Sequence, residues 1–259
     1  MNKIFAYPPS MTPRTTHYCP GCTHGVIHRM VGEVIDELGI RGRTVGIAPV
    51  GCSVLAYEYF NCDMFQASHG RAPAVATGAK RSRPELIVFA YQGDGDLASI
   101  GMAEIVHAAN RGEKITVIFV NNAIYGMTGG QMAPTTMPGQ RATTCPAGRD
   151  VSEVGYPIKV AELLAQLNTP AYVARGSAHN VRETIRTKQY IRRAFEHQVA
   201  GTCFSLVEVL STCPTNWGLS TRESANWLAR EMIPYYPLGE IKHPEDHPDF
   251  KAAAAGEVN

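Results

Sequence analysis

The feature that most constrains the fold is a set of short runs that are apolar at nearly every position. Such runs predict strands that are buried on both faces, because a half-exposed strand would alternate apolar and polar residues. Helical stretches separate them along the chain. This alternation indicates a doubly wound α/β fold, with helices on both faces of a mostly parallel sheet. The predicted strands are 44–50, 86–92, 115–121, 171–176 and 203–212, with the run 203–212 expected to be the last strand.

The predicted helices are 24–38, 73–80, 98–112, 160–167 and 180–198. In the first of these, Val26, Met30, Val34 and Leu38 recur at helical spacing and are expected on the buried face. A further helix through about Met232 should begin at a capping box of Ser220 and Glu223. A long loop rich in Gly, Thr and Pro follows residue 121 and is typical of a functional segment.

Polar and sulfur-bearing side chains follow four of the predicted strands. In parallel sheets of this kind, ligands bind beyond the carboxyl ends of the strands. We therefore expect residues that are far apart in sequence to share one edge of the sheet. The residues in question are Cys52, Asp94, Asn121 with Asn122, and Cys213.

The run GDGD (93–96) has the glycine spacing of a nucleotide-binding turn, but it carries two acids. Carboxylates beside a bound diphosphate repel it in a water-poor site unless a divalent cation lies between them. Mg²⁺ prefers six oxygen ligands, and a carboxylate of Asp94 with the amide oxygen of Asn122 would supply two of them. The spacing of Asp94 and Asn122 suits two adjacent parallel strands, so the sequence predicts a magnesium–diphosphate site.

The cysteines suggest a second metal centre. Cys19 and Cys22 lie on a predicted tight turn, and Cys52 and Cys213 each follow a strand. Four thiolates suit either Zn²⁺ or a [4Fe–4S] cluster, and the number of ligands does not separate the two. Cys62, Cys145 and Cys203 are expected to be structural, with Cys203 the one rival to Cys213 as fourth ligand.

GDG at 93–95 followed by NN at 121–122 resembles the signature of thiamine-diphosphate-dependent enzymes. Together with CPGC (19–22), GC (51–52) and CPT (213–215), it resembles the β subunit of the 2-oxoacid:ferredoxin oxidoreductases, of the 2-oxoisovalerate or 2-oxoglutarate type. The similarity runs from about His17 to Gly239. Further matching stretches are 69–80, 124–136 and 235–239.

The resemblance implies a thiamine-diphosphate-binding fold and one domain over 1–259, with a CxxC segment at about 12–23 and a C-terminal extension at about 214–259. It implies Asp94, Asn122 and the carbonyl of Ile124 as Mg²⁺ ligands, and iron rather than zinc at the cysteines. It also places the amides of Gly95 and Asp96 near the diphosphate. The other implied cofactor-binding residues are Gly51, Cys52, Ser53, His69, Gly70, Gly93, Tyr125, Gly126, Met127 and Thr128.

The activity implied by the resemblance is oxidative decarboxylation of a 2-oxo acid to an acyl-coenzyme A, with electrons passed through the cluster to ferredoxin. His69 and Arg71 resemble an active-site stretch and would bind the substrate carboxylate or a phosphate. Gly129 stands where some 2-oxoglutarate-using relatives have a lysine, which favours a branched-chain or other 2-oxo acid.

Partners are implied as well. No acid in the chain is placed to activate thiamine, and in the family a glutamate of an α subunit supplies it. We therefore expect this chain to be inactive alone, with a γ subunit and a ferredoxin-like δ subunit as further companions. The tail 242–259 is polar enough to be mobile or to lie on a partner.

Composition excludes some classes of partner. Lys and Arg total 24 against 23 Asp and Glu, a formal charge of +1, which argues against nucleic acid and anionic membranes. The apolar runs are too short to span a bilayer, and the proline-rich start lacks the apolar stretch of a signal peptide. We therefore expect a cytoplasmic protein, in which cysteines stay reduced.

Two other functions are consistent with parts of the pattern. One is a non-catalytic four-cysteine zinc or iron–sulfur scaffold, and the other is a non-oxidative thiamine-dependent decarboxylase. A nicotinamide dehydrogenase is disfavoured by the acids in the GDGD turn. His24, His28 and His107 lie on predicted helices and are expected to be structural.

Overall fold

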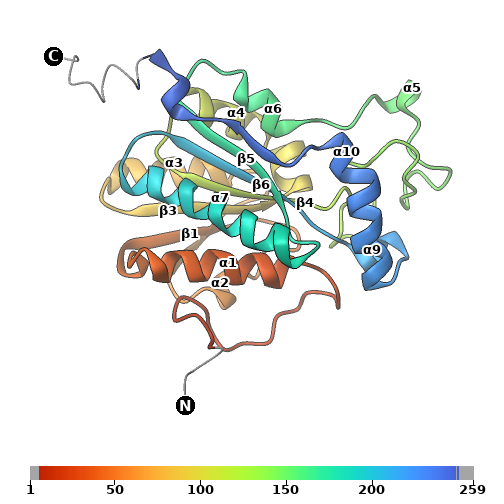
Figure 1. Cartoon of the computed structure of the whole chain (residues 1–259), viewed down its shortest axis with the longest axis horizontal. Coiled ribbons are helices and arrows are strands. Elements are labelled where there is room, and N and C mark those ends of the chain that lie inside the picture. The colour runs from red at the N-terminus through yellow and green to blue at the C-terminus, as the bar shows by residue number, and fades with distance from the viewer. Residues whose placement is uncertain (1–5, 249, 251–259) are drawn as a thin grey trace.

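The computed structural model describes residues 6–248 and 250, and within them a seven-stranded sheet has the order β2-β1-β3-β4-β6-β5-β7 (Figure 1). All neighbouring strands run parallel except β7, which pairs antiparallel with β5. The expected α/β fold with a mostly parallel sheet is confirmed. The strands are β1 Thr44–Ala48, β2 Asp63–Gln66, β3 Ile87–Gly93, β4 Thr116–Asn121, β5 Ala171–Ser177, β6 Phe204–Leu210 and β7 Gly239–Lys242.

Helices cover both faces of the sheet. The α-helices are α1 His24–Glu37, α2 Ala56–Tyr59, α3 Ala72–Ser82, α4 Met102–Asn110, α5 Val151–Val154, α6 Val160–Ala165, α7 Val181–Val199, α8 Pro214–Trp217, α9 Thr221–Trp227 and α10 Ile233–Tyr235. Short 3₁₀ turns lie at Arg41–Arg43 and Pro244–Asp246, and π-helical turns at Asp96–Ile100 and Leu228–Met232. In Figure 1, α1 and α7 cross the near face, α3 and α4 lie behind the strands, and α9 and α10 stand at one end.

The burial of the strands explains why this order forms. Successive residues of the central strands point to opposite faces, and both faces are buried. Phe89 and Tyr91 pack with α1 and α7 in one apolar cluster, whereas Val88 and Ala90 pack with α3, α4 and α6 in another. Two separate cores therefore hold the sheet between helical layers.

Two expectations about local structure are corrected, and one strand was not predicted. The strand at 203–212 is not the last one, because β7 follows it and pairs with the edge of β5. β2 was not predicted, since it is a largely exposed edge strand without an apolar run. Val26 is 40% exposed, because the buried stripe of α1 runs through Ile27, Met30 and Val34 instead.

The order of the strands places the predicted site residues together. β1, β3, β4 and β6 are consecutive in the sheet, and all four run in the same direction. Cys52, Asp94, Asn122 and Cys213 follow the ends of these four strands. They therefore lie along one edge of the sheet, as expected. Nowhere in the described ranges is a helix both long and apolar enough to cross a membrane.

The capping box predicted at α9 is present. Ser220 Oγ accepts a hydrogen bond from the amide of Glu223 at 3.3 Å, and Glu223 accepts one from the amide of Ser220 at 2.9 Å. We expect Ser220→Ala to lower the free energy of unfolding by about 1 kcal/mol in chemical denaturation. Arg222→Ala, an exposed change on the same helix, should alter it by less than about 0.5 kcal/mol. Equal losses in both variants would contradict a role for the cap.

Candidate functional site

The first acid of the GDGD turn is buried at the edge of the sheet. Asp94 is only 4% exposed, and one carboxylate oxygen accepts a hydrogen bond from the amide of Gly95 at 2.8 Å. The other accepts from the amide of Ile124 at 3.1 Å and from the hydroxyl of Thr135 at 2.7 Å. Burial nevertheless raises the pKa of Asp94 to about 7. A nearby positive charge would offset this desolvation and hold the carboxylate ionised.

Oxygen atoms crowd together beside Asp94. Asn122 Oδ1 lies 2.7 Å from the carbonyl oxygen of Ile124 and 3.3 Å from Asp94 Oδ2, with no proton between them. Rotating the amide would let its nitrogen donate to both oxygens. A divalent cation would instead bind all three, since Mg²⁺–oxygen distances of about 2.0–2.1 Å place adjacent ligands about 2.9 Å apart. Carboxylate, amide and carbonyl oxygens form the donor set that Mg²⁺ prefers.

A cavity of about 210 Å³ opens beside these oxygens. Gly70 and Arg71 do not line it. Four residues that line it were not predicted, namely His24, Val50, Ser99 and Ile100. The predicted residues that do line it are Gly51, Cys52, Ser53, His69, Gly93, Asp94, Gly95, Asp96, Asn122, Ile124, Tyr125, Gly126, Met127 and Thr128.

Some of the four unpredicted residues have a signal in the sequence, and one does not. Val50 adjoins Gly51, and Ser99 and Ile100 lie in the π-helical turn after GDGD, where such turns often mark functional sites. His24 was expected to be structural, and its Nδ1 lies 2.9 Å from the Tyr91 hydroxyl. Burial lowers the pKa of His24 to about 3, so this ring is neutral. Only the packing of α1 on the sheet reveals that it also borders the cavity.

The second acid of GDGD has a different role from the first. The carboxylate of Asp96 is buried and lies 2.5 Å from His69 Nδ1. It also accepts hydrogen bonds from the amide of Gly70 at 2.7 Å and from Gln92 Nε2 at 2.5 Å. Asp96 therefore fixes the orientation of His69 at the cavity wall. A contact between its amide and a diphosphate stays a prediction.

Gly70 and Arg71 shape the turn rather than the cavity. Gly70 has φ of +77°, and a methyl group there would lie 2.7 Å from the backbone nitrogen of Gly101. Only glycine fits this conformation and this approach. Arg71 forms an ion pair with Glu104 on α4. Direct contact of Gly70 or Arg71 with a cofactor or substrate stays a prediction.

The four predicted cluster cysteines line a second cavity of about 210 Å³. This cavity shares Cys52, Asn122, Gly126 and Met127 with the first, so the two are adjacent. A methyl group on Gly126 would lie 3.2 Å from the sulfur of Cys52 and 3.5 Å from that of Cys213. Across the described residues, no three His, Cys, Asp or Glu side chains are already gathered as metal ligands. The four thiols thus face one space without forming a closed shell.

The chemistry of these thiols is consistent with a metal centre. All seven cysteines are free. Burial and then the neighbouring groups raise the pKa of Cys22 to about 11 and that of Cys52 to about 12. Burial likewise raises the pKa of Cys213. Thiols with raised pKa values bind a metal as thiolates because the cation compensates their charge. Cys62, Cys145 and Cys203 do not line the cavity, and Cys203 is fully buried in the core.

Hydrogen bonds hold the CPGC turn beside the end of β6. The hydroxyl of Thr212 donates to the carbonyl of Gly21 at 2.8 Å, and the hydroxyls of Thr23 and Ser211 lie 2.6 Å apart. Gly21 has φ of +79°, and a methyl group there would lie 2.3 Å from Thr221 Oγ1. The first two cysteines of the chain are therefore fixed next to Cys213.

Comparison with known proteins identifies the family. Residues 49–209 match the C-terminal TPP binding domain of thiamine pyrophosphate enzymes. The 2-oxoglutarate synthase subunit KorB of Archaeoglobus fulgidus is 35% identical over 78% of this chain and 71% of the relative. The chain belongs to the 2-oxoacid:ferredoxin oxidoreductase family. It is a β-type subunit of that family, which carries the TPP-binding domain.

Two further relatives of this oxidoreductase subunit place it within the family. The ketoisovalerate oxidoreductase subunit VorA of Methanothermobacter thermautotrophicus is 49% identical over 93% of this chain but only 51% of the relative. The chain thus spans about half the length of VorA. A solved 2-oxoglutarate:ferredoxin oxidoreductase from Magnetococcus marinus superposes with a TM-score of 0.71 and 30% identity, over 82% of this chain and 69% of that one.

The wall shared by the two cavities should not tolerate added volume. Gly126→Ala would place its methyl group against both sulfurs and 3.6 Å from Asn122 Nδ2. Because overpacking costs about 1–3 kcal/mol, we expect the affinity for thiamine diphosphate to fall about tenfold. Calorimetric titration would measure it. Gly25→Ala is the matched control, since nothing lies within 4 Å of that position. Unchanged affinity in Gly126→Ala would contradict this account of the wall.

Proposed function

We propose that the chain binds thiamine diphosphate with Mg²⁺ in the first cavity and a [4Fe–4S] cluster between Cys19, Cys22, Cys52 and Cys213. With partner subunits, it would catalyse coenzyme A-dependent oxidative decarboxylation of a 2-oxo acid and pass the electrons to ferredoxin. The observation that carries the proposal is the shared wall of the two cavities, because electrons released at one would have a short path to the other.

The overall reaction sets what the site must do. The bond between the carboxylate and the 2-oxo carbon breaks and releases CO₂, and a bond forms between that carbon and the coenzyme A sulfur. One proton and two electrons leave, and two ferredoxins take up one electron each. Thiamine diphosphate, when bound, supplies the electron sink that this decarboxylation needs. An iron–sulfur cluster accepts electrons singly, which suits a one-electron carrier.

The chain's own residues have separate roles in this scheme. Asp94, Asn122 and the Ile124 carbonyl would hold Mg²⁺ and so neutralise the diphosphate. Asp96 holds Nδ1 of His69, which leaves Nε2 as the ring nitrogen available to a ligand at the cavity wall. His69 would then bind the substrate carboxylate or move a proton there.

The cavity lining supports the need for an α subunit. The carboxylates among its described lining residues are those of Asp94 and Asp96, and both already have partners within the chain. Neither is placed to activate thiamine, so a glutamate from a partner subunit would do so. About half of the VorA sequence lies outside the match, so that relative has a further segment with no counterpart in the matched region. A γ subunit and a ferredoxin-like δ subunit would complete the complex.

The substrate is proposed to be a branched-chain 2-oxo acid. The 49% identity to VorA exceeds the 35% identity to KorB, and Gly129 provides no cationic side chain for a second carboxylate. A neutral, apolar side chain on the substrate therefore suits this site better than the dicarboxylate 2-oxoglutarate.

The purified complex should reduce a viologen dye with 2-oxoisovalerate and coenzyme A, and more slowly with 2-oxoglutarate. The chain alone should show no activity, and the complex should contain iron, sulfide and thiamine diphosphate. Zinc without thiamine diphosphate would identify a metal-binding scaffold instead. Aldehyde formation without dye reduction would identify a non-oxidative decarboxylase.

The role of Asp96 can be separated from cofactor binding. We expect Asp96→Asn to lower kcat about a hundredfold, because it weakens the hold on His69, with a smaller change in affinity for thiamine diphosphate. Glu113→Gln, which disturbs the ion pairs with Arg81 and Arg111 outside the cavity, is the control and should retain most activity. Equal kcat values in the two variants would argue against a role for His69.

A further inference from the structure

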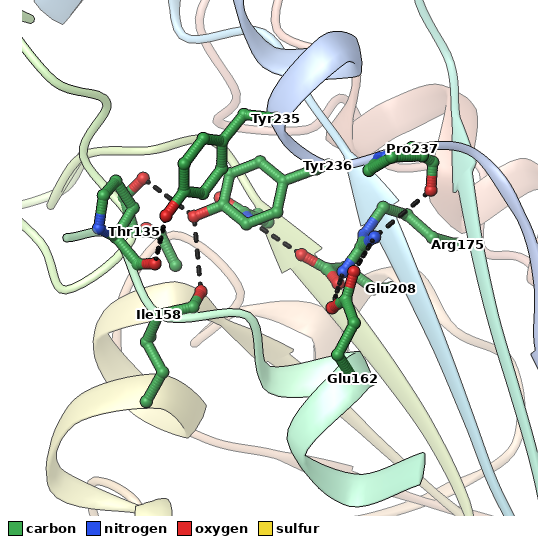
Figure 2. Close-up of polar contacts among 10 residues, drawn as sticks. Thr135, Ile158, Glu162, Arg175, Glu208, Tyr235, Tyr236 and Pro237 are labelled. Atoms are coloured by element: carbon green, nitrogen blue, oxygen red, sulfur yellow. Dashed lines mark hydrogen bonds and ion pairs between the residues drawn. The ribbon is translucent and has the colours of Figure 1, made fainter. Parts of the chain in front are cut away.

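Behind the cation-binding oxygens lies a buried polar network that the proposed chemistry does not use. Arg175 on β5 and Glu208 on β6 are both fully buried, and Arg175 Nε donates to Glu208 Oε2 at 2.8 Å. Arg175 also donates to both oxygens of Glu162 at 2.8 and 2.5 Å and to the carbonyl of Pro237 at 3.2 Å. Figure 2 shows these groups converging on the guanidinium. A buried pair of this kind costs desolvation energy to form, and removing one partner leaves an uncompensated buried charge.

One arm of the network reaches the turn that follows β4. The second oxygen of Glu208 accepts a hydrogen bond from Asn121 Nδ2 at 2.7 Å. Asn121 Oδ1 in turn accepts one from the backbone amide of Ala123 at 3.1 Å. Asn121 is therefore held away from the cation-binding oxygens, and its side chain links the ion pair to the turn.

The link stabilises an unusual backbone conformation at Ala123. Ala123 is the one non-glycine residue in the described ranges with a positive φ, at 56°. That conformation costs an L-residue about 1–2 kcal/mol, so the surroundings must impose it. Besides the contact with Asn121, the carbonyl of Ala123 accepts hydrogen bonds from Thr136 Oγ1 at 2.7 Å and Gln140 Nε2 at 3.1 Å. The resulting turn brings the Ile124 carbonyl beside Asn122 Oδ1.

A second arm runs from the C-terminal segment to Asp94. The hydroxyl of Tyr236 donates to the carbonyls of Thr135 at 3.2 Å and Ile158 at 3.3 Å, and its ring lies 5.2 Å from the Arg175 guanidinium carbon (Figure 2). Thr135 donates its own hydroxyl to Asp94 Oδ2. The two arms thus start from neighbouring groups and end on different ligands of one proposed cation.

We propose that Glu208 and Tyr236 are positioning residues for the Mg²⁺ site, Glu208 through Asn121 and Ala123 and Tyr236 through Thr135. This inference rests on the proposed binding of thiamine diphosphate with Mg²⁺. It makes the segment at Tyr236 and Pro237, far from the signature residues in sequence, part of the machinery that sets cation affinity. Mutation of a residue that hydrogen-bonds to a metal ligand and so orients it typically lowers metal affinity about 10–100-fold.

Two adjacent tyrosines offer a matched test. Tyr236→Phe and Tyr235→Phe each remove a hydroxyl that donates to backbone carbonyls, but Tyr235 donates to Pro157 at 2.8 Å, away from the cation ligands. Equilibrium dialysis of thiamine diphosphate against a MgCl₂ titration, with the full chain in its complex, gives the half-saturating Mg²⁺ concentration. We expect Tyr236→Phe to raise it about tenfold and Tyr235→Phe to leave it within about twofold.

A second pair of variants tests the other arm. Glu208→Gln should also raise the half-saturating Mg²⁺ concentration about tenfold. Adding Ala123→Gly should restore most of this loss, because glycine adopts positive φ without strain. The melting temperature should stay low in the double variant, since Arg175 still lacks its buried anion. A role in stability alone predicts no such rescue of Mg²⁺ binding.

The outcomes separate this inference from the function on which it rests. If the unaltered complex binds thiamine diphosphate without any dependence on Mg²⁺, the proposed cation site is wrong, and the inference with it. If binding depends on Mg²⁺ but Tyr236→Phe and Tyr235→Phe behave alike, the proposed function stands and the positioning role of Tyr236 is overturned. Should Glu208→Gln fail to fold, the tyrosine pair still decides.

Discussion

The arrangement of the site depends on three polar groups that meet at one edge of the sheet, where a bound cation would hold their oxygens together and where rotation of the Asn122 amide would otherwise relieve the contact. The carboxylate of Asp94, the amide oxygen of Asn122 and the carbonyl of Ile124 come from two adjacent strand ends and face one another. The parallel sheet makes this approach possible, because it brings the carboxyl ends of β3 and β4 to the same edge. The buried turns around them hold the oxygens in place.

The same edge continues to cysteine side chains on either side. β1 and β6 flank the central pair β3 and β4, and they lead to Cys52 and Cys213 respectively. An oxygen-rich site in the middle and sulfur from the two outer strands thus follow from strand order alone. The proposed Mg²⁺ and [4Fe–4S] sites would therefore share one wall, with oxygen ligands for the hard cation and sulfur ligands for the soft metal centre.

Much of this was predictable because the relevant signals are local. The buried strands show as unbroken apolar runs, and GDG and NN mark the ends of two of them. What escaped prediction depends on three-dimensional packing. The exposed edge strand β2 has no apolar run, and His24 reaches the cavity only because α1 packs where it does. Asp96 was expected to act through its amide, yet its carboxylate bonds to His69, a partner that spacing alone does not reveal.

The buried Arg175–Glu208 pair was equally invisible in sequence. Arg175 stands in a predicted apolar strand and would ordinarily be expected to point to solvent. Its burial is accounted for only when Glu162, Glu208 and the carbonyl of Pro237 are seen around it (Figure 2). Polar groups that satisfy one another inside a core are set by the whole fold, not by any one segment.

The contact between the CPGC turn and the end of β6 also bears on how the protein is made. Cys19 and Cys22 leave the ribosome long before Cys213, which follows β6. The proposed four-sulfur centre therefore cannot close while the nascent chain is short. Insertion of the proposed cluster would have to wait until β6 has paired between β4 and β5, so it would follow folding of the sheet rather than accompany synthesis of the first two cysteines.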